Sequence, residues 1–291
     1  MRRMSIDFRP MKPEDASGVY EVSTNALNET PEERERIQNR TPEEVQQRID
    51  RHSHFIQHDP DGAWVAVDGD RVVGVALALV REEVWILSLF AVDEKYRGQR
   101  IGYELLRRAL EYADGCTGGM ICASTHPAAM RRYARAGFTL HPTLMASGAV
   151  RENDIPKNLS VRDGNKQDLT LAAEVDRALR GAAHGPDLEH MLETGDHLLI
   201  SENDSGRGYA VAHKGSPNIV AATTPEIASE LLWACLARAD GEVEVRWITA
   251  LQNWAIPVVL EAGLALFPAG PICTRGNLGS LTPYLPSGPF L

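Results

Sequence analysis

The 291-residue sequence lacks the features of a membrane-spanning, secreted or disulfide-bonded protein. No apolar run approaches the ~18 residues needed to span a bilayer, and residues 1–15 lack the apolar core of a signal peptide. The cysteines include no C-x-x-C pair and have no histidines at metal-ligand spacing. We therefore expect a cytoplasmic protein with no membrane partner, whose thiols stay reduced at Cys116, Cys122, Cys235 and Cys273.

An excess of positive charge is also absent. The chain has 30 Lys and Arg residues against 40 Asp and Glu residues, a formal net charge of −10 and a pI of about 5.4. This balance argues against a nucleic-acid partner, because nucleic acids select basic surfaces. An acidic surface tolerates a cationic substrate, although acidity also serves solubility alone. His54 and His58 would share a helix face, but no carboxylate pattern accompanies them, and we predict no metal site.

The chain does have the composition of a globular protein, with 43% hydrophobic and 24% charged residues. In its first half, strand-like and helix-like segments follow one another closely. The predicted strands cover 5–9, 63–67, 72–80, 84–92, 118–124 and 138–149, and the predicted helices cover 13–26, 41–54, 101–114 and 127–136. Residues 28–41 are highly charged and are expected to form a solvated loop or helix that covers an opening.

A polar segment at 151–158, which contains Pro156, predicts a domain boundary. After it the order of elements begins again, as two copies of one unit would. Strands are expected at 160–162, 198–201, 208–212, 217–222 and 243–249, and helices at 165–179, 184–193, 225–238 and 254–261. The end of the chain is rich in Pro and Gly, and 283–291 too much so for a regular element. We predict two domains, at 1–150 and 159–291.

The stretch from 84 to 112 combines an apolar run, a glycine-containing turn and an amphipathic helix. The run at 84–92 has the length and the Trp, Ile, Val and Phe content of a buried strand. The turn R-G-Q-R-I-G at 97–102 follows, and after it apolar residues recur at helical spacing. Such a turn directs several backbone N–H groups, backed by the helix dipole, at one point in space. The stretch therefore predicts an anion site, most often one for phosphate.

A second motif, H-P-A-A-M-R-R-Y-A-R-A-G-F, lies at 126–138. Together the two motifs resemble those of the GNAT family of acyl-CoA-dependent N-acetyltransferases. The family signatures are Q/R-x-x-G-x-G/A after an apolar strand and N-x-x-A-x-x-x-Y-x-x-x-G-F on a helix. This chain departs from them at Arg100, where Gly is usual, and at His126, where Asn is usual. The resemblance implies an α/β fold of two tandem domains, each with a mixed, mostly antiparallel central sheet flanked by helices.

The resemblance also implies acetyl-CoA as the co-substrate. The backbone of 90–92 would pair with the pantetheine arm as an added strand would, and the N–H groups of 98–102 would hold the pyrophosphate. The implied cofactor-binding residues are Phe90, Ala91, Val92, Arg97, Gly98, Gln99, Arg100, Ile101, Gly102, Tyr103, His126, Ala129 and Arg132. Arg100 still offers its backbone N–H; its guanidinium either contacts a phosphate or faces solvent.

Tyr133 falls where many family members place the acid that protonates the departing thiolate, so the resemblance implies a catalytic role. The alternative is a core tyrosine on an amphipathic helix. His126 either contacts the cofactor or caps the helix that it precedes. No residue is assigned as the general base. Each candidate can equally be read as a surface residue with no catalytic role, and ordered water can also carry the amine proton. These candidates are Glu29, Glu82, Glu83 and His141.

The second half keeps less of the family pattern. Residues 223–228 contain neither Arg nor Gly in the turn before the long helix, and Val259 stands at the tyrosine position. We predict that this copy binds no cofactor and supplies a wall of the substrate pocket. The resulting hypothesis is an acyltransferase that moves acetyl from acetyl-CoA to the amine of a small molecule by direct attack, as a monomer or homodimer. The alternative is a non-catalytic acyl-CoA-binding sensor or regulatory module.

Overall fold

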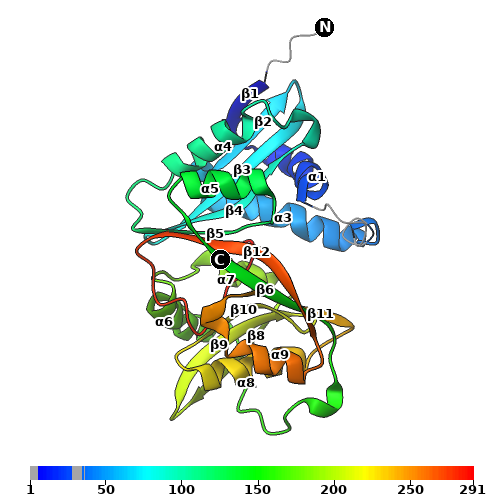
Figure 1. Cartoon of the computed structure of the whole chain (residues 1–291), viewed down its shortest axis with the longest axis vertical. Helices are drawn as coiled ribbons and strands as arrows, with labels where there is room; N and C mark the ends of the chain where they lie inside the picture. Colours follow the sequence, from blue (N-terminus) through cyan, green and yellow to red (C-terminus); the bar gives the residue numbers. More distant parts are fainter. Residues whose placement is uncertain (1–5, 28–34, 36) are drawn as a thin grey trace. The chain divides into compact units, whose positions relative to one another are not determined.

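The computed structural model of the chain describes residues 6–27, 35 and 37–291 (Figure 1). By packing, it divides into two compact units, Met1–Val80 with Trp85–Cys116 and Arg81–Val84 with Thr117–Leu291. This division does not test the predicted domain boundary between 150 and 159, which stays a prediction. The charged covering segment expected at 28–41 lies mostly outside the described residues.

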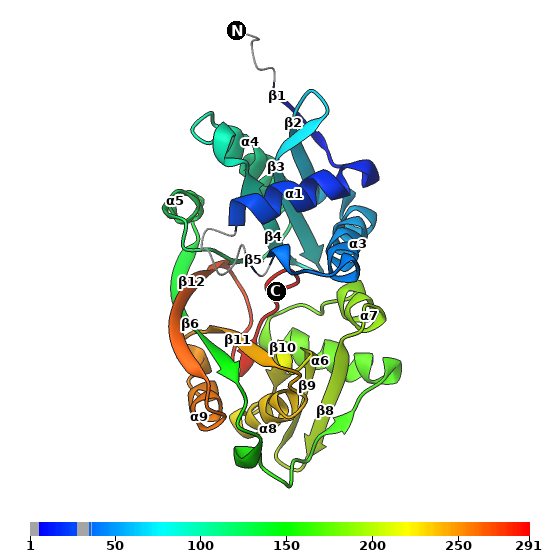
Figure 2. The ribbon, with the colours of Figure 1, turned by 90° about the vertical axis from the view of Figure 1, so that its right-hand side faces the viewer.

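The first unit is built on strands in the order β1-β2-β3-β4, with antiparallel pairing of β1 with β2 and of β2 with β3. Its elements are β1 (Ile6–Pro10), α1 (Ala16–Leu27), α3 (Pro42–His58), β2 (Ala63–Asp68), β3 (Arg71–Arg81), β4 (Val84–Val92) and α4 (Ile101–Glu111). Helix α4 covers one face of these strands, and α1 and α3 cover the other (Figures 1 and 2).

Local sequence signals account for most of these boundaries. Gly69 at φ +62° forms the β2–β3 hairpin turn that its sequence predicted. Helix α3 begins with a capping box: the Thr41 side chain accepts from the Glu44 N–H, and the Glu44 carboxylate accepts from the Thr41 N–H. Val84–Leu87 of β4 are buried, as expected for the apolar run. The strand that leads to the predicted anion site is therefore fixed in the core of its unit.

His52 on α3 makes the stability of the first unit depend on pH. Its side chain is buried, and Nδ1 lies 3.4 Å from the Ala16 carbonyl oxygen on α1. Burial, with a smaller effect of Arg51, lowers the pKa of His52 from 6.5 to about 3. The unfolded chain takes up this proton as the pH falls through 6.5, whereas the folded chain does not. Stability is therefore complete above pH 6.5 and falls as the pH drops toward 3.

We expect this single group to lower the free energy of unfolding by about 1.4 kcal/mol for each pH unit across that window. The measurement is urea denaturation at several pH values between 7 and 4. His52→Asn removes the titration and should flatten the profile, whereas His58→Asn, at an exposed position of the same helix, should leave the slope as it is. Equal slopes in wild type and His52→Asn would contradict the assignment.

The second unit contains four strands in the order β5-β12-β6-β11. They are β5 (Gly118–Cys122), β12 (Ala265–Gly276), β6 (Thr139–Ala149) and β11 (Glu242–Ile248). All three pairings are antiparallel. Strands β5 and β6 come from the first half of the chain and β11 and β12 from the second, so strands of the two halves alternate. Neither half completes this part of the fold without the other.

A second sheet of this unit has the order β13-β10-β9-β8-β7. These strands are β7 (Arg162–Asp163), β8 (His197–Asn203), β9 (Gly206–His213), β10 (Ser216–Ala222) and β13 (Tyr284–Leu285). The helices of the unit are α5 (Pro127–Arg135), α6 (Leu169–Leu179), α7 (Pro186–Glu193), α8 (Pro225–Leu236) and α9 (Ala255–Glu261). The expectation that 283–291 holds no regular element is wrong at β13, which pairs with β10.

Strand β12 was not among the predicted elements either. This strand continues through Pro268 and Pro271, residues that interrupt an ordinary strand because they lack an N–H. Its register with β6 shifts between Ala269 and Ile272, which accommodates the interruption. Its partners β5 and β6 are remote in sequence, so no local pattern indicated the strand.

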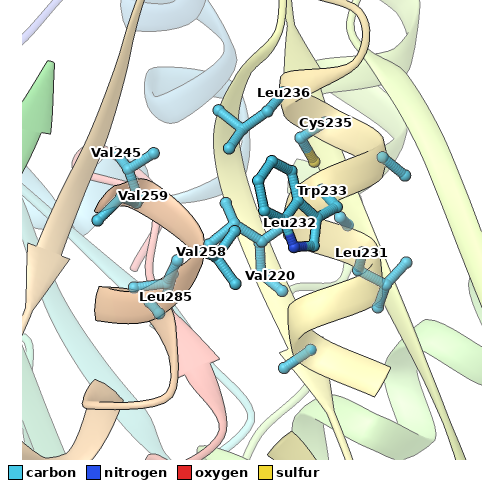
Figure 3. Close-up of a cluster of buried hydrophobic side chains, with 14 of the residues drawn as sticks. Val220, Leu231, Leu232, Trp233, Cys235, Leu236, Val245, Val258, Val259 and Leu285 are labelled. Atoms are coloured by element: carbon cyan, nitrogen blue, oxygen red, sulfur yellow. The ribbon is translucent and has the colours of Figure 1, made fainter. Parts of the chain in front are cut away.

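The core of the second unit forms where α8 and α9 face each other (Figure 3). Leu232 and Trp233 of α8 and Val258 of α9 are buried in one cluster, together with Leu285 of β13. Burying side chains of this size stabilises the fold by about 1.5–3 kcal/mol each. The apolar face of α8 is thus a packing surface. Among the described residues, no helix is both long enough and apolar enough to cross a membrane.

Candidate active site

The predicted anion site lies between the end of β4 and the start of α4. Arg100 is the N-cap residue of α4 and has a left-handed backbone, with φ 65° and ψ 2°. Its side chain makes no capping hydrogen bond, and its carbonyl accepts the N–H groups of Tyr103 and Glu104 at 2.9 and 3.1 Å. The N–H groups of Ile101 and Gly102 precede the first intrahelical bond. They therefore belong to the helix end that suits an anion.

Several hydrogen bonds hold the segment before this turn. Asp93 accepts from the Arg71 guanidinium at 2.7 Å and from the Lys95 backbone N–H at 2.9 Å. Tyr96 donates its hydroxyl to the Asp68 carboxylate at 2.9 Å. Arg97 donates through Nη2 to the Ala26 carbonyl at 3.2 Å, at the end of α1. The segment that leads into the turn is thus held by hydrogen bonds within its own unit.

A glycine on β3 sets how closely α4 approaches the sheet. A Cβ at Gly74 would come within 2.9 Å of the Leu105 side chain and 3.2 Å of the Ile101 side chain. Only glycine leaves these two α4 residues in place at that distance, since real Cβ contacts are longer. Gly74 therefore positions the helix whose first turn forms the anion site. No role was predicted for Gly74 from the sequence.

Three exposed cationic side chains lie close together in sequence at the turn. Lys95, Arg97 and Arg100 are exposed within six consecutive residues of a chain with net charge −10. Phe90 and Val92 on β4 are half-buried, and Tyr103 on α4 is 56% exposed. The residues predicted to bind cofactor in this unit therefore lie in two runs, 90–92 at the end of β4 and 97–103 in the turn and the first turn of α4.

The left-handed backbone at Arg100 explains why Gly is usual at this position of the turn. A non-glycine residue in this conformation destabilises the folded chain by about 1–2 kcal/mol. Glycine avoids this strain, but its greater conformational freedom in the unfolded chain offsets part of the gain in stability. We expect Arg100→Gly to raise the free energy of unfolding by about 0.5–1 kcal/mol. Urea denaturation tests this, with Gln99→Gly as the control that should not stabilise. A destabilised Arg100→Gly variant would show that the side chain makes contacts that outweigh the strain.

The remaining predicted site residues lie on α5 in the second unit. Tyr133 is buried, and burial raises the pKa of its phenol above the usual value of 10. His126 is the N-cap of α5, but its side chain makes no capping hydrogen bond, so capping through that side chain does not occur. Ala129 and Arg132 are half-buried on the same helix. Tyr133 is therefore a neutral hydroxyl throughout the physiological pH range.

The general-base candidates have defined surroundings. Glu82 lies in a hairpin at φ 53° and forms an ion pair with Arg177 at 2.7 Å. The hydrogen bond from Arg177 lowers the pKa of the Glu82 carboxyl, which makes it a weaker base. His141 Nε2 lies 2.8 Å from the Thr274 hydroxyl on β12. Glu83 is exposed, and Glu29 lies outside the described residues.

Ser88 is a polar residue of β4 that was not among the predicted site residues. It stands inside the apolar run of β4, and its hydroxyl oxygen is buried with no hydrogen-bond partner among the described residues. Side chains two apart on a strand share a face, which places Ser88 with Phe90. A lone serine in a buried strand was the available signal. Within the described part of the chain, no group of three His, Cys, Asp or Glu residues could hold a metal ion.

Comparisons with known proteins give a family match for part of the chain and similar folds for nearly all of it. Residues 26–138 match the sequence model of a family described as "Acetyltransferase (GNAT) family". The fold is similar to that of a Pyrococcus horikoshii protein described as a candidate acetyltransferase, with a TM-score of 0.78, 18% identity and coverage of 99% of this chain and 95% of that one. Comparison with curated protein sequences gives no match.

Two further solved structures are similar along most of their length. A GCN5-related N-acetyltransferase from Sphaerobacter thermophilus has a TM-score of 0.59 and 15% identity, covering 93% of this chain and 95% of that one. A tandem GNAT protein from the clavulanic acid biosynthesis pathway has a TM-score of 0.57 and 12% identity, covering 94% and 98%. Residues 26–138 thus match the GNAT family of acetyltransferases, and the predicted tandem GNAT-like fold is confirmed.

Proposed function

We propose that the chain transfers an acetyl group from acetyl-CoA to an amine of a small-molecule substrate. The observation that carries the proposal is the turn at 97–102. It combines Gly98 at φ +83°, a left-handed Arg100 and an α4 N-terminus without a side-chain cap. A side-chain cap would take up the N–H groups that a phosphate needs. The family match over 26–138 supports the same assignment.

The residues present fit the co-substrate. The N–H groups of 98–102 would hold the pyrophosphate, and the positive charges of Arg97 and Arg100 suit it. The backbone edge at 90–92 would pair with the amides of the pantetheine arm. On α5, His126, Ala129 and Arg132 are the further contacts that we propose. Bound acetyl-CoA would supply an activated thioester, and no metal is required for that chemistry.

In the proposed reaction the deprotonated amine attacks the thioester carbonyl carbon directly. A C–N bond forms and the C–S bond breaks, so the leaving group is a thiolate that takes up a proton. Tyr133 is assigned as the donor of that proton. Its raised pKa keeps the phenol protonated at working pH, which a general acid requires. Backbone N–H groups of β4 would polarise the carbonyl.

The proton that leaves the amine is assigned to ordered water. Glu82 is engaged by Arg177, and its lowered pKa argues against it as a base. We further propose one catalytic domain at 1–150, a degenerate copy at 159–291, and action as a monomer or homodimer in the cytoplasm. The second copy would bind no cofactor and would contribute to the substrate pocket.

A thiol-release assay tests this function against the rival of an acyl-CoA sensor. The protein is mixed with acetyl-CoA and with each member of a panel of primary amines, including polyamines, aminoglycosides and amino acids. Transfer predicts amine-dependent release of free CoA for at least one of these classes. Tight CoA binding without release for any amine would favour the sensor, and absence of CoA binding would overturn both readings.

A further inference from the structure

The fourth strand of the second half, β10, carries an added strand along its edge. Its last residues pair antiparallel with β13, Val220 opposite Leu285 and Ala221 opposite Tyr284. The Ala222 N–H donates to the Pro283 carbonyl at 3.2 Å. Proline suits this place because only its carbonyl is used there. Strand β9 pairs along the other edge of β10, so β10 is paired on both sides.

The added strand β13 lies at a position of the second half that has a counterpart in the first half. In each half a fourth strand ends at a turn that leads into a long helix, β4 into α4 and β10 into α8. The last three residues of β10 are 220–222, and the last three of β4 are 90–92. The residues that pair with 283–285 therefore correspond to those assigned above to the pantetheine arm.

Side chains of the second unit hold β13 in place. Tyr284 is buried, and its hydroxyl lies 3.4 Å from Nε2 of His184. The other ring nitrogen of His184, Nδ1, lies 2.7 Å from the Asp176 carboxylate, which also accepts a hydrogen bond from Tyr209 at 2.5 Å. All four of these side chains are buried. Leu285 completes the hold by packing into the apolar cluster with Val258 (Figure 3).

The turn that follows β10 is closed as well. The Thr224 side chain is the cap of α8 and accepts from the Ile227 N–H at 3.4 Å. Thr223 bonds twice to the strand β9: its hydroxyl accepts from the Arg207 N–H at 3.0 Å, and its own N–H donates to the Arg207 carbonyl at 2.9 Å. In the first half, by contrast, the Arg100 side chain makes no cap bond.

We propose that β10 offers a strand-edge site for an extended amide-bearing chain and that residues 283–285 fill it as a built-in ligand. This inference rests on the proposed function, because it equates the filled edge with the one assigned to pantetheine in the first half. The Asp176–His184–Tyr284 network fixes that ligand. One chain then binds one CoA, at the first half alone.

Hydrogen exchange and equilibrium dialysis with CoA test the proposal on the full chain. In the double variant Tyr284→Gly, Leu285→Gly, we expect amide exchange at Val220 and Ala222, whose N–H groups face β13, to rise about tenfold or more, since the strand pair opens locally. A synthetic peptide of residues 277–291 added in trans should restore the protection. CoA affinity should stay within about twofold of wild type. The control, Asn277→Gly with Ser280→Gly, alters the same segment outside the pairing and should change neither readout.

A milder variant covers the case in which the double variant fails to fold. Tyr284→Phe keeps the backbone pairing and removes only the contact with His184, so exchange at Val220 and Ala222 should rise about threefold. Unchanged exchange in Tyr284→Phe, or protection that the peptide does not restore, would overturn the proposal. Dialysis should count one CoA per wild-type chain; two would overturn this inference alone, whereas none would overturn the proposed function.

Discussion

Tyr133→Phe is expected to lower kcat for acetyl transfer about 10²–10⁴-fold, the range that a general acid contributes. The variant loses one hydroxyl from a buried position on α5, so its fold and its affinity for acetyl-CoA should stay close to those of wild type. Steady-state thiol release with the best amine of the panel measures kcat, and dialysis measures the affinity. A loss confined to kcat assigns the hydroxyl to the chemical step.

Tyr112→Phe is the matched control for this prediction. Its hydroxyl donates to Asp59 at 3.1 Å near the end of α4, and we assign it no part in the reaction. It should keep kcat within about threefold, since a structural hydrogen bond acts on stability and not on the barrier. If Tyr133→Phe also stays within that range for every accepted amine, Tyr133 is a core tyrosine and not the acid.

Asp187→Ala is expected to lower the free energy of unfolding by about 3–5 kcal/mol. Asp187 and Arg81 form a two-fold hydrogen-bonded ion pair, with both N–O distances 2.7 Å, in which the Asp187 side chain is fully buried and that of Arg81 is 6% exposed. Removing the carboxylate leaves a buried guanidinium without its counter-charge. Urea denaturation of the purified variant measures the loss.

Two comparisons isolate the origin of that loss. Arg177→Gln breaks an ion pair with Glu82 whose side chains are 54% and 39% exposed, and should cost less than about 1 kcal/mol. The double variant Arg81→Met, Asp187→Leu replaces the pair by apolar side chains and should recover most of the stability. A single Asp187→Ala variant within 1 kcal/mol of wild type would show that the Arg81 charge finds another partner.

The first half of the fold was predictable because its signals are local. The apolar run of β4, the turn at Gly69 and the Thr41 capping box each act within a few residues, and each element formed where it was expected. Strand β12 was not predictable in this way. Its prolines break the strand pattern, and its hydrogen bonds come from β5 and β6, which lie more than a hundred residues earlier in the chain.

The candidate site likewise contains residues that local motifs revealed and residues that only the fold brings together. The turn at 97–102 and the Tyr133 helix carry motifs, so the residues could be named from sequence, although their roles stay predictions. The left-handed backbone of Arg100 was only implied by the glycine expected there. The cluster of Asp176, His184, Tyr209 and Tyr284 draws on separate segments, and no spacing reveals such a contact in advance.

The alternation of strands in the order β5-β12-β6-β11 also bears on how the two copies depend on each other. A chain cut between 150 and 159 would leave β5 and β6 without the strand that lies between them. Unpaired strand edges of that kind favour aggregation. Function is therefore best tested on the whole chain and not on the predicted catalytic domain alone.

The most direct test of the central claim follows a radiolabelled acetyl group from acetyl-CoA in a single turnover with an accepted amine. Direct transfer predicts that the label appears on the amine at the rate at which free CoA appears, with no label on the denatured protein at any time. Label on the protein that then chases into product would contradict direct attack. Label that stays on acetyl-CoA with every amine, while the protein binds it, would contradict the acetyltransferase assignment itself.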